Sequence, residues 1–168
     1  IKFSDYLKKF KKKILKENSK DLFLAKKIKS NMLERLRLDN KKIDQIIKSV
    51  KEIAKFKDPL GKTLALWKRP NKLIIKKISI PIGVIGVIYE SRPNVTSDIS
   101  SLCFKTGNAV ILRGGSEAFH SNKILADLFR KALKNKNCNI NCIQFIENQN
   151  RKNVDYLLSK MQNYIDII

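Results

Sequence analysis

The stretch that decides the fold runs from residue 81 to residue 122 and reads PIGVIGVIYESRPNVTSDISSLCFKTGNAVILRGGSEAFHSN. Its continuous apolar run at residues 83–89 predicts a buried strand. Apolar side chains then recur at the spacing of one helix face, at Val95, Ile99, Leu102 and Cys103. Gly107 is the residue type that commonly ends a helix, and a second apolar strand follows at residues 109–112. The stretch therefore predicts a strand–helix–strand unit with parallel strands.

The same alternation continues from this unit to the last residue. A further helix face is formed by Ile124, Leu125, Leu128, Phe129, Ala132 and Leu133. Residues 142–146 predict a strand, residues 154–158 a short helix, and residues 164–168 a final strand. This β-α-β-α-β-α-β order predicts a parallel sheet with helices on both faces, the doubly wound α/β class, over residues 81–168.

Two segments precede the sheet. Residues 1–57 predict helices, because apolar residues recur every three or four positions among many lysines. The predicted helical stretches carry Phe3, Tyr6, Leu7, Phe10 and Ile14, then Leu22, Leu24, Ala25 and Ile28, and last a helix that opens near Asp39 and Asn40. Residues 58–80 predict a β-hairpin, with strands at 63–67 and 73–80.

The formal net charge of +21 has two explanations. A nucleic-acid-binding module would carry a basic face for phosphates. Compositional drift would instead enrich Lys, Ile and Asn together. The lysines are scattered over nearly every segment and greatly outnumber the arginines, which favours drift. We therefore expect no specific nucleic-acid partner, and the basic module stays an alternative whose binding would depend strongly on salt.

Location and metal content follow from what the sequence contains. No apolar run reaches the length of a membrane helix, and no leader peptide is recognisable, so we expect a cytoplasmic protein without a membrane partner. Three cysteines and the single His120 do not have zinc-ligand spacing, so we expect free thiols and no metal site. The start at Ile1 and the apolar last segment lead us to expect a fragment at both ends.

Two segments would carry chemistry, because ligands of such sheets bind outside the carboxyl ends of the strands. The first is residues 89–94 and the second is residues 113–117. In the second, paired glycines allow backbone N–H groups to approach a phosphate or ribose, or they form a turn that Ser116 caps before a helix. In the first, Asn94 either caps the following helix or presents its amide to a developing oxyanion.

The same residues carry a resemblance to a known family. The patterns P-x-G-V-I-G-V-I-Y-E-x-R-P-N-V-T and L-C-x-K-x-G-N-A-V-I-L-R-G-G-S-E, both within residues 81–117, are similar to the signature region of γ-glutamyl phosphate reductases. Weaker similarity covers residues 32–36, 58–61 and 164–166. Essentially the whole chain is covered, but it corresponds to well under half of the usual family length.

The resemblance implies a fold and an activity. The family belongs to the aldehyde dehydrogenase superfamily, with a Rossmann-like cofactor domain, a catalytic domain that this chain lacks, and an oligomerisation hairpin. It implies the NADPH-dependent reduction of L-glutamate 5-phosphate to L-glutamate 5-semialdehyde, with release of phosphate, in proline biosynthesis. It also implies a homo-oligomer and an association with glutamate 5-kinase.

The resemblance assigns roles to individual residues. Asn94 matches the asparagine that stabilises the oxyanion, and Arg113 matches a position that faces the adenine ribose and would suit the 2′-phosphate of NADP. The adjoining cofactor turn comprises Gly114, Gly115, Ser116 and Glu117. The cofactor or acyl-phosphate channel would be lined by Ser91, Arg92 and Pro93. His120 is expected to be an ordinary helix residue.

The family's nucleophilic cysteine is not among these residues. None of Cys103, Cys138 and Cys142 occupies its position, so we expect this polypeptide to be inactive by itself. A fragment of an active reductase is the favoured interpretation, and an inactive nucleotide-binding remnant is the alternative.

Overall fold

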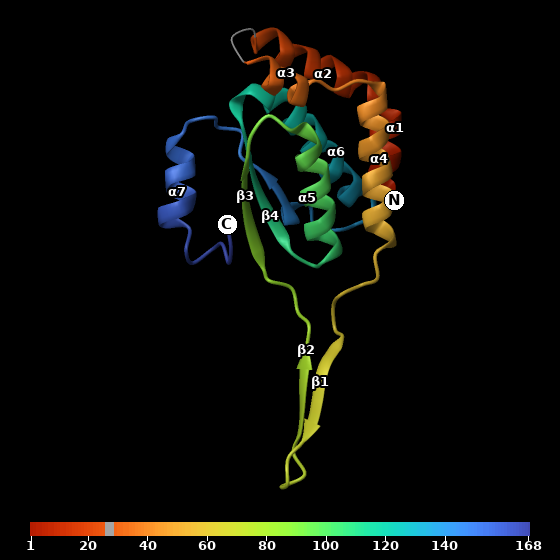
Figure 1. Ribbon diagram of the computed structural model, residues 1–168, viewed down its shortest axis with the longest axis vertical. Helices are drawn as coiled ribbons and strands as arrows, with labels where there is room; N and C mark the ends of the chain where they lie inside the picture. The colour runs from red at the N-terminus through yellow and green to blue at the C-terminus, as the bar shows by residue number, and fades with distance from the viewer. Residues whose placement is uncertain (26–28) are drawn as a thin grey trace.

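The computed structural model describes residues 1–25 and 29–168 and has three visible parts (Figure 1). A group of helices lies on one side of a parallel sheet, one further helix lies on its other side, and a two-stranded arm projects away from both. Ile28, which was predicted to lie on a helix face, is outside the described residues.

The amino-terminal region forms helices α1 (Lys2–Lys9), α2 (Lys11–Leu24), α3 (Ser30–Leu36) and α4 (Asn40–Lys55). The first predicted helical stretch is interrupted at Phe10, although its N–H still donates to the Tyr6 carbonyl at 2.9 Å. Helix α4 begins as predicted, because the carboxylate of Asp39 accepts the backbone N–H of Lys42 at 2.7 Å. A cap of this kind contributes about 1 kcal/mol to stability.

The helices and the sheet bury their apolar faces against each other. Phe3 of α1 packs on Phe129 of α6 (Phe119–Asn135), with ring centroids 4.5 Å apart. Helices α1, α2 and α4 all contact the helices that cover the sheet. The shared core includes Leu7, Ile14, Ile43, Ile47, Val110, Leu112, Leu125, Leu128 and Ile143. The predicted apolar face of α6 is confirmed, since all six of its predicted residues are buried.

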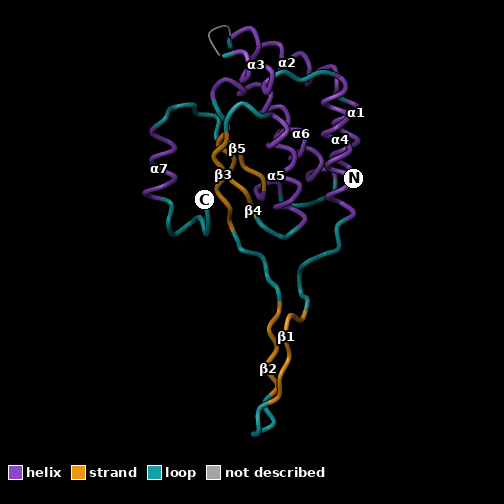
Figure 2. The backbone as a smooth tube through the Cα atoms, viewed as in Figure 1, coloured by secondary structure: helices purple, strands orange, loops and turns teal. Residues whose placement is uncertain are grey.

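The arm is the predicted hairpin. Strands β1 (Thr63–Lys68) and β2 (Ile74–Ile78) pair antiparallel, with Trp67 opposite Ile75. Apart from the half-buried Ile75, every residue of both strands is exposed. The hairpin extends well beyond the body of the molecule (Figure 2).

The sheet contains β3 (Val84–Tyr89), β4 (Ala109–Gly114) and β5 (Ile143–Phe145), which are parallel and lie in that order. Helix α5 (Pro93–Lys105) connects β3 to β4, and α6 connects β4 to β5 after the short 3₁₀ helix η1 (Ser116–Ala118). A second 3₁₀ turn, η2 (Ile140–Cys142), precedes β5. Helices α5 and α6 lie on one side of the sheet and α7 (Lys152–Lys160) lies on the other (Figure 1). The predicted parallel α/β class is confirmed.

The predicted final strand is wrong. The N–H groups of Tyr164 and Ile165 both donate to the Met161 carbonyl at 2.9 Å, so this segment starts as a turn rather than as extended chain. The chain then reaches the sheet at Ile167, which forms a parallel bridge to Ile85. Two backbone hydrogen bonds hold this contact, from the Asp166 N–H to the Val84 carbonyl at 2.9 Å and from the Gly86 N–H to the Ile167 carbonyl at 2.8 Å. The outer edge of β3 is therefore covered by a short contact.

Two burial predictions also need correction. Strand β3 is not fully buried: Ile88 is 40% exposed, whereas Ile85, Val87 and Tyr89, on the other face of the strand, pack against the core. On α5, Leu102 belongs to the predicted apolar face but is 37% exposed. The buried face of that helix carries small polar side chains instead, which let α5 pack closely between α4 and α6. They are Thr96, Ser97, Ser100 and Ser101, with Cys103 beside them.

Candidate active site

The two predicted site segments meet at one end of the sheet. Tyr89 and Gly114, the last residues of β3 and β4, are register partners, so the loops that follow them start side by side. A hydrogen bond joins the loops: the Ser91 hydroxyl donates to Glu117 Oε1 at 2.8 Å. Ser91 is only 2% exposed, which makes this bond part of the structural framework of the site.

The loop after β3 leads directly into helix α5. Pro93 is the first helical residue, a position that suits proline because the first N–H groups of a helix have no intrahelical partner. Arg92 precedes it, and its side chain is exposed. Within the described ranges 1–25 and 29–168, the Arg92 side chain has no hydrogen bond or ion-pair partner.

Asn94 does not cap α5, so that interpretation is wrong. It is the second residue of the helix, and its side-chain amide donates to Asp98 Oδ2 at 3.2 Å. The other oxygen of Asp98 accepts the Ser49 hydroxyl of α4 at 2.8 Å. Asp98 thereby fixes the orientation of the Asn94 amide, and the second amide N–H of this exposed asparagine has no partner among the described residues.

The sequence interpretation missed Asp98. Its spacing of four residues from Asn94 was the available signal, because residues at i and i+4 lie on the same helix face.

A buried polar chain lies behind the two loops. The Tyr89 hydroxyl is 2.7 Å from Thr96 Oγ1, which donates to Asn122 Oδ1 at 3.0 Å. Burial raises the pKa of Tyr89 to about 12, although the Thr96 hydrogen bond and the Arg113 charge act in the opposite direction. A side chain at Gly114 would collide with the Asn122 amide, so glycine is required there by its own neighbours.

The loop after β4 is more enclosed. Arg113 belongs to β4 itself and is 7% exposed. Its terminal nitrogens donate to the carbonyl of Gly114 and, at 3.1 Å, to the carbonyl of Gln149. Its Nε is buried and has no hydrogen-bond partner among residues 1–25 and 29–168. A side chain at Gly115 would collide with the Glu117 carboxylate, which lies across the turn.

Ser116 does not cap the following helix, contrary to one of the two predicted readings of this turn. The backbone N–H groups of His120 and Ser121 donate instead to the carboxylate of Asp21, at 2.9 and 2.7 Å. The Ser121 hydroxyl donates to the same carboxylate at 2.6 Å. Burial raises the pKa of Asp21, and its hydrogen bonds oppose this. Asp21 comes from α2, about a hundred residues away, so no local pattern predicts this cap.

Known proteins resemble this chain in sequence and in fold. No family model matches the chain. A γ-glutamyl phosphate reductase from Carboxydothermus hydrogenoformans is 43% identical over 170 residues, covering 100% of this chain and 41% of that protein. The crystal structure of γ-glutamyl phosphate reductase from Thermotoga maritima has a TM-score of 0.93 and 38% identity, covering 98% of this chain and 40% of that one.

The chain is a homologue of γ-glutamyl phosphate reductase. It spans about 40% of the length of the curated relatives that it matches. A probable aldehyde dehydrogenase from Listeria monocytogenes shares the fold, with a TM-score of 0.64 at 15% identity over 93% of this chain and 32% of its own.

In the present chain, two hollows lie next to Arg92. One has a volume of about 430 Å³ and lies between α4 and the start of α5; its lining includes Arg35, Lys42, Arg92, Asn94 and Asp98. The other, of about 330 Å³, lies at the end of β3 and is lined by Met32, Arg35 and residues 88–92. The chain adds β4 and then β5 on one side of β3, and Ile167 pairs on the other side of β3. Ligands of doubly wound sheets bind at such a point, where the direction of strand addition reverses.

Cys103 and Cys142 of this chain do not have the environment that activates a thiol as a nucleophile. Burial raises the pKa of the Cys103 thiol on α5, and burial also raises the pKa of Cys142. A raised pKa reduces the thiolate fraction that reacts. Over residues 1–25 and 29–168, no group of three His, Cys, Asp or Glu side chains is placed to hold a metal ion.

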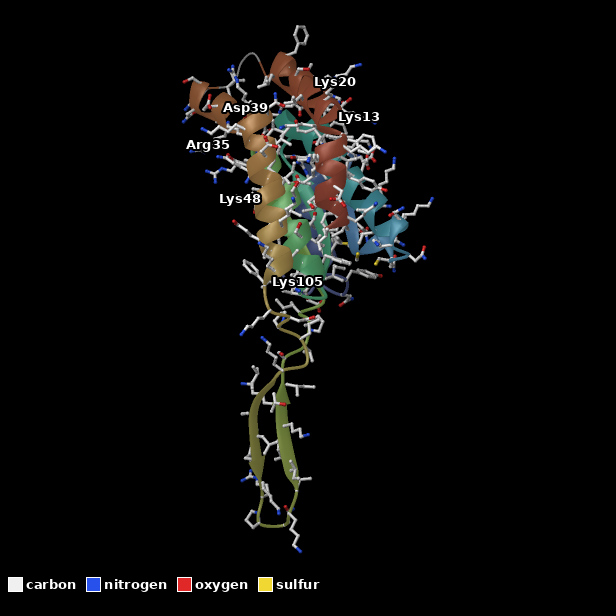
Figure 3. All side chains as sticks on the ribbon, turned by 90° about the vertical axis from the view of Figure 1, so that its right-hand side faces the viewer. Lys13, Lys20, Arg35, Asp39, Lys48 and Lys105 are labelled. Atoms are coloured by element: carbon white, nitrogen blue, oxygen red, sulfur yellow. The ribbon has the colours of Figure 1, made fainter. Side chains whose placement is uncertain are left out.

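The remaining sequence expectations concern His120 and the basic charge. His120 lies in the first turn of α6, with its ring 3.8 Å from Glu17. The lysines labelled in Figure 3, Lys13, Lys20, Lys48 and Lys105, come from three different helices. In the described part of the chain, no helix is both long and apolar enough to span a membrane.

Proposed function

We propose that this chain forms part of a γ-glutamyl phosphate reductase that reduces L-glutamate 5-phosphate to L-glutamate 5-semialdehyde and phosphate with NADPH, in proline biosynthesis. The observation that carries the proposal is the extent of the similarity. The Thermotoga maritima reductase matches 98% of this chain at 38% identity, and the match includes the ends of β3 and β4. The other 60% or so of the reductase length would supply the rest of the active site.

Asn94 is proposed to stabilise the oxyanion that forms on the acyl carbonyl. Its amide carries one N–H that Asp98 holds and one that points to no protein acceptor in the described residues. An amide fixed before the reaction stabilises developing charge without a reorganisation cost. The buried hydrogen bond of Ser91 and the fixed geometry of Pro93 keep the start of α5 in place.

The cofactor would be held at the loop after β4. Glu117 would accept hydrogen bonds from ribose hydroxyls, and Ser116, the exposed residue of the turn of Gly114, Gly115 and Ser116, would lie beside them. Arg113 would place positive charge next to a 2′-phosphate, and its buried Nε is a donor without a partner in the described part of the chain. These features fit a phosphorylated ribose. When bound, the reduced nicotinamide supplies the two electrons that convert the acyl group to the aldehyde.

The nucleophile is proposed to be the family's cysteine, from polypeptide outside these 168 residues. The buried Cys103 and the raised thiol pKa of Cys142 support this assignment. By itself, the chain would bind ligands but would not turn them over.

The hairpin is proposed to join protomers of a homo-oligomer. Its exposed apolar side chains, Leu64, Leu66, Trp67, Ile74 and Ile78, would be covered by a second copy. An exposed apolar surface of this kind marks an interaction site. Association with glutamate 5-kinase remains a proposal from the pathway alone.

A chimera tests the proposed function. Residues 1–168 would replace the matching part of the Thermotoga maritima reductase, and NADP-dependent oxidation of L-glutamate 5-semialdehyde would be measured with phosphate present. We expect phosphate-dependent formation of NADPH. A folded chimera without activity, beside an active parent enzyme, would contradict the proposal.

A further inference from the structure

The hollow between α4 and the start of α5 has an unusual charge arrangement. Its lining contains three cations, Arg35, Lys42 and Arg92, and a single carboxylate, Asp98. Both oxygens of that carboxylate already accept hydrogen bonds, from Ser49 and from Asn94. The lining therefore carries an excess of positive charge, although Lys42 also forms an ion pair with Glu34, a residue outside the lining, at 3.4 Å.

The two arginines are available to a ligand. In the part of the chain that the structure describes, neither Arg35 nor Arg92 has a hydrogen-bond or ion-pair partner. Both line this hollow and also the smaller one at the end of β3, so they stand at the boundary between the two. Arginine binds phosphate oxygens with two parallel N–H groups, which a lysine cannot do.

Lys42 has a different position in the same hollow. Its Nζ donates to the carbonyls of Glu34 and Arg37, at 2.7 and 2.9 Å, and lies 3.4 Å from the Glu34 carboxylate. It therefore fixes the end of α3, and with it the helix that carries Arg35 (Figure 3). Its charge is paired with Glu34, so the charge available to a ligand in the hollow comes from the two arginines.

The general basic charge of the chain does not account for this arrangement. Lysines predominate elsewhere on the surface, whereas arginine is scarce in the sequence. Here two partnerless arginines from α3 and from the start of α5 border one concave site next to Asn94. The volume of about 430 Å³ is in the range of small-molecule sites, and Leu38 and Ile46 provide an apolar wall.

We propose that this hollow binds the phosphoryl group of an acyl phosphate, with Arg35 and Arg92 as its direct ligands. The choice of an acyl phosphate rests on the proposed function, whereas the anion site itself rests on the cavity and its charges. With the phosphoryl group between the arginines, the adjoining acyl carbonyl lies on the side of Asn94. The hollow thus binds the phosphoryl leaving group of the substrate, and the loop after β4 binds the cofactor.

Binding of small anions to the chain itself tests the site. Inorganic phosphate and acetyl phosphate would be titrated into the 168-residue polypeptide at low salt, with backbone amide signals followed by NMR. We expect saturable shifts at residues 35–42 and 92–98. Adenosine 2′,5′-bisphosphate would be titrated in parallel, because a cofactor phosphate is the other source of the same chemistry.

Matched variants identify the ligands. Arg92→Gln and Arg35→Gln should each weaken phosphate binding about 10-fold, the effect of losing one charged hydrogen-bonding group. Lys48→Gln is the control: it removes the same charge from α4, but Lys48 lies outside both hollows and pairs only loosely with Glu52, at 3.9 Å. We expect it to change binding less than about twofold, since exposed charges are well screened. Circular dichroism would verify that each variant is folded.

Two results would overturn the proposal. The first is an equal loss of affinity in Lys48→Gln and Arg92→Gln, which would mean diffuse attraction to a basic protein. The second is tighter binding of adenosine 2′,5′-bisphosphate at the same amides, which would assign the hollow to the cofactor. The chimera assay tests the proposed function independently of this titration. Failure of the anion site can therefore be distinguished from failure of the proposed function.

Discussion

The loops after β3 and β4 start from neighbouring residues but are built in opposite ways. After β3, Arg92 and one N–H of Asn94 have no partner in the described residues and face open hollows. At the end of β4, Arg113 is buried and donates to two carbonyls, and in the loop that follows, Glu117 accepts the Ser91 hydroxyl. The difference teaches that binding capacity is concentrated after β3, while the segment after β4 also supports the fold.

The largest expected effect is a loss of turnover on substitution in the segment after β3. In the chimera, Asn94→Ala should lower turnover by about 10²-fold or more, because an oxyanion donor is lost. The free energy of unfolding should change by less than about 0.5 kcal/mol, since the side chain is exposed. Steady-state kinetics and urea unfolding measure the two quantities. Full turnover in this variant would leave Asn94 with no role beyond its bond to Asp98.

At the buried end of β4, a substitution should instead lower the free energy of unfolding. Arg113→Met should reduce the free energy of unfolding by about 2 kcal/mol, because the carbonyls of Gly114 and Gln149 lose their buried donors. Arg92→Met, the matched substitution in the other loop, should cost less than about 0.5 kcal/mol. Urea unfolding followed by circular dichroism compares them, and similar losses would remove the contrast between the loops.

The same Arg113→Met substitution also tests the cofactor role. In the chimera, the KM for NADPH should rise far more than the KM for NADH, because only NADPH carries the 2′-phosphate. Equal increases would mean that Arg113 acts through the fold alone.

The bond between the loops should have a smaller effect. Ser91→Ala removes the hydroxyl that donates to Glu117 and should lower the free energy of unfolding by about 1 kcal/mol. Glu117→Gln is the matched change, since it keeps an oxygen acceptor, and should cost less. If the glutamine variant is the less stable of the two in urea, the carboxylate charge matters more than the bond.

The smallest effect concerns Tyr89, between the loops. Burial raises its pKa from 10 to about 12, so the folded state disfavours the phenolate. Between these values the folded protein holds more protons than the unfolded one, and its free energy of unfolding must fall as the pH rises. Tyr89→Phe should remove that part of the decrease. Ultraviolet titration of tyrosine should show a group at about 12 that disappears in the variant; its persistence would contradict the assignment.

The sequence predicted those parts of the fold that depend on local periodicity. The hairpin, the strand–helix–strand unit and the buried face of α6 follow from spacings within a few residues, and the structure contains them. The exposed Leu102 could not be predicted, because the buried face of α5 consists mainly of small hydroxyl residues, with Cys103 beside them. The prediction of a strand at residues 164–168 was wrong for a related reason. An apolar run does not reveal whether its backbone pairs with a neighbouring strand or forms a turn.

The sequence predicted which residues form the candidate site but not the contacts that position them. The motif pointed to residues 91–94 and 113–117, and the structure brings these loops together. The caps depend on contacts across the fold: Asp21 reaches α6 from α2, and Ser49 holds Asp98 from α4. No spacing in the sequence records such contacts. The arginine pair of Arg35 and Arg92 is likewise visible only in three dimensions.

The position of a bound substrate analogue tests the central claim most directly. A crystal structure of the chimera with a non-hydrolysable phosphonate analogue of L-glutamate 5-phosphate would show which loop faces the reacting group. We predict that the analogue's carbonyl oxygen lies about 3 Å from the Asn94 amide nitrogen, with the phosphonate between Arg35 and Arg92. An analogue bound away from the start of α5, with Asn94 still donating only to Asp98, would contradict the account.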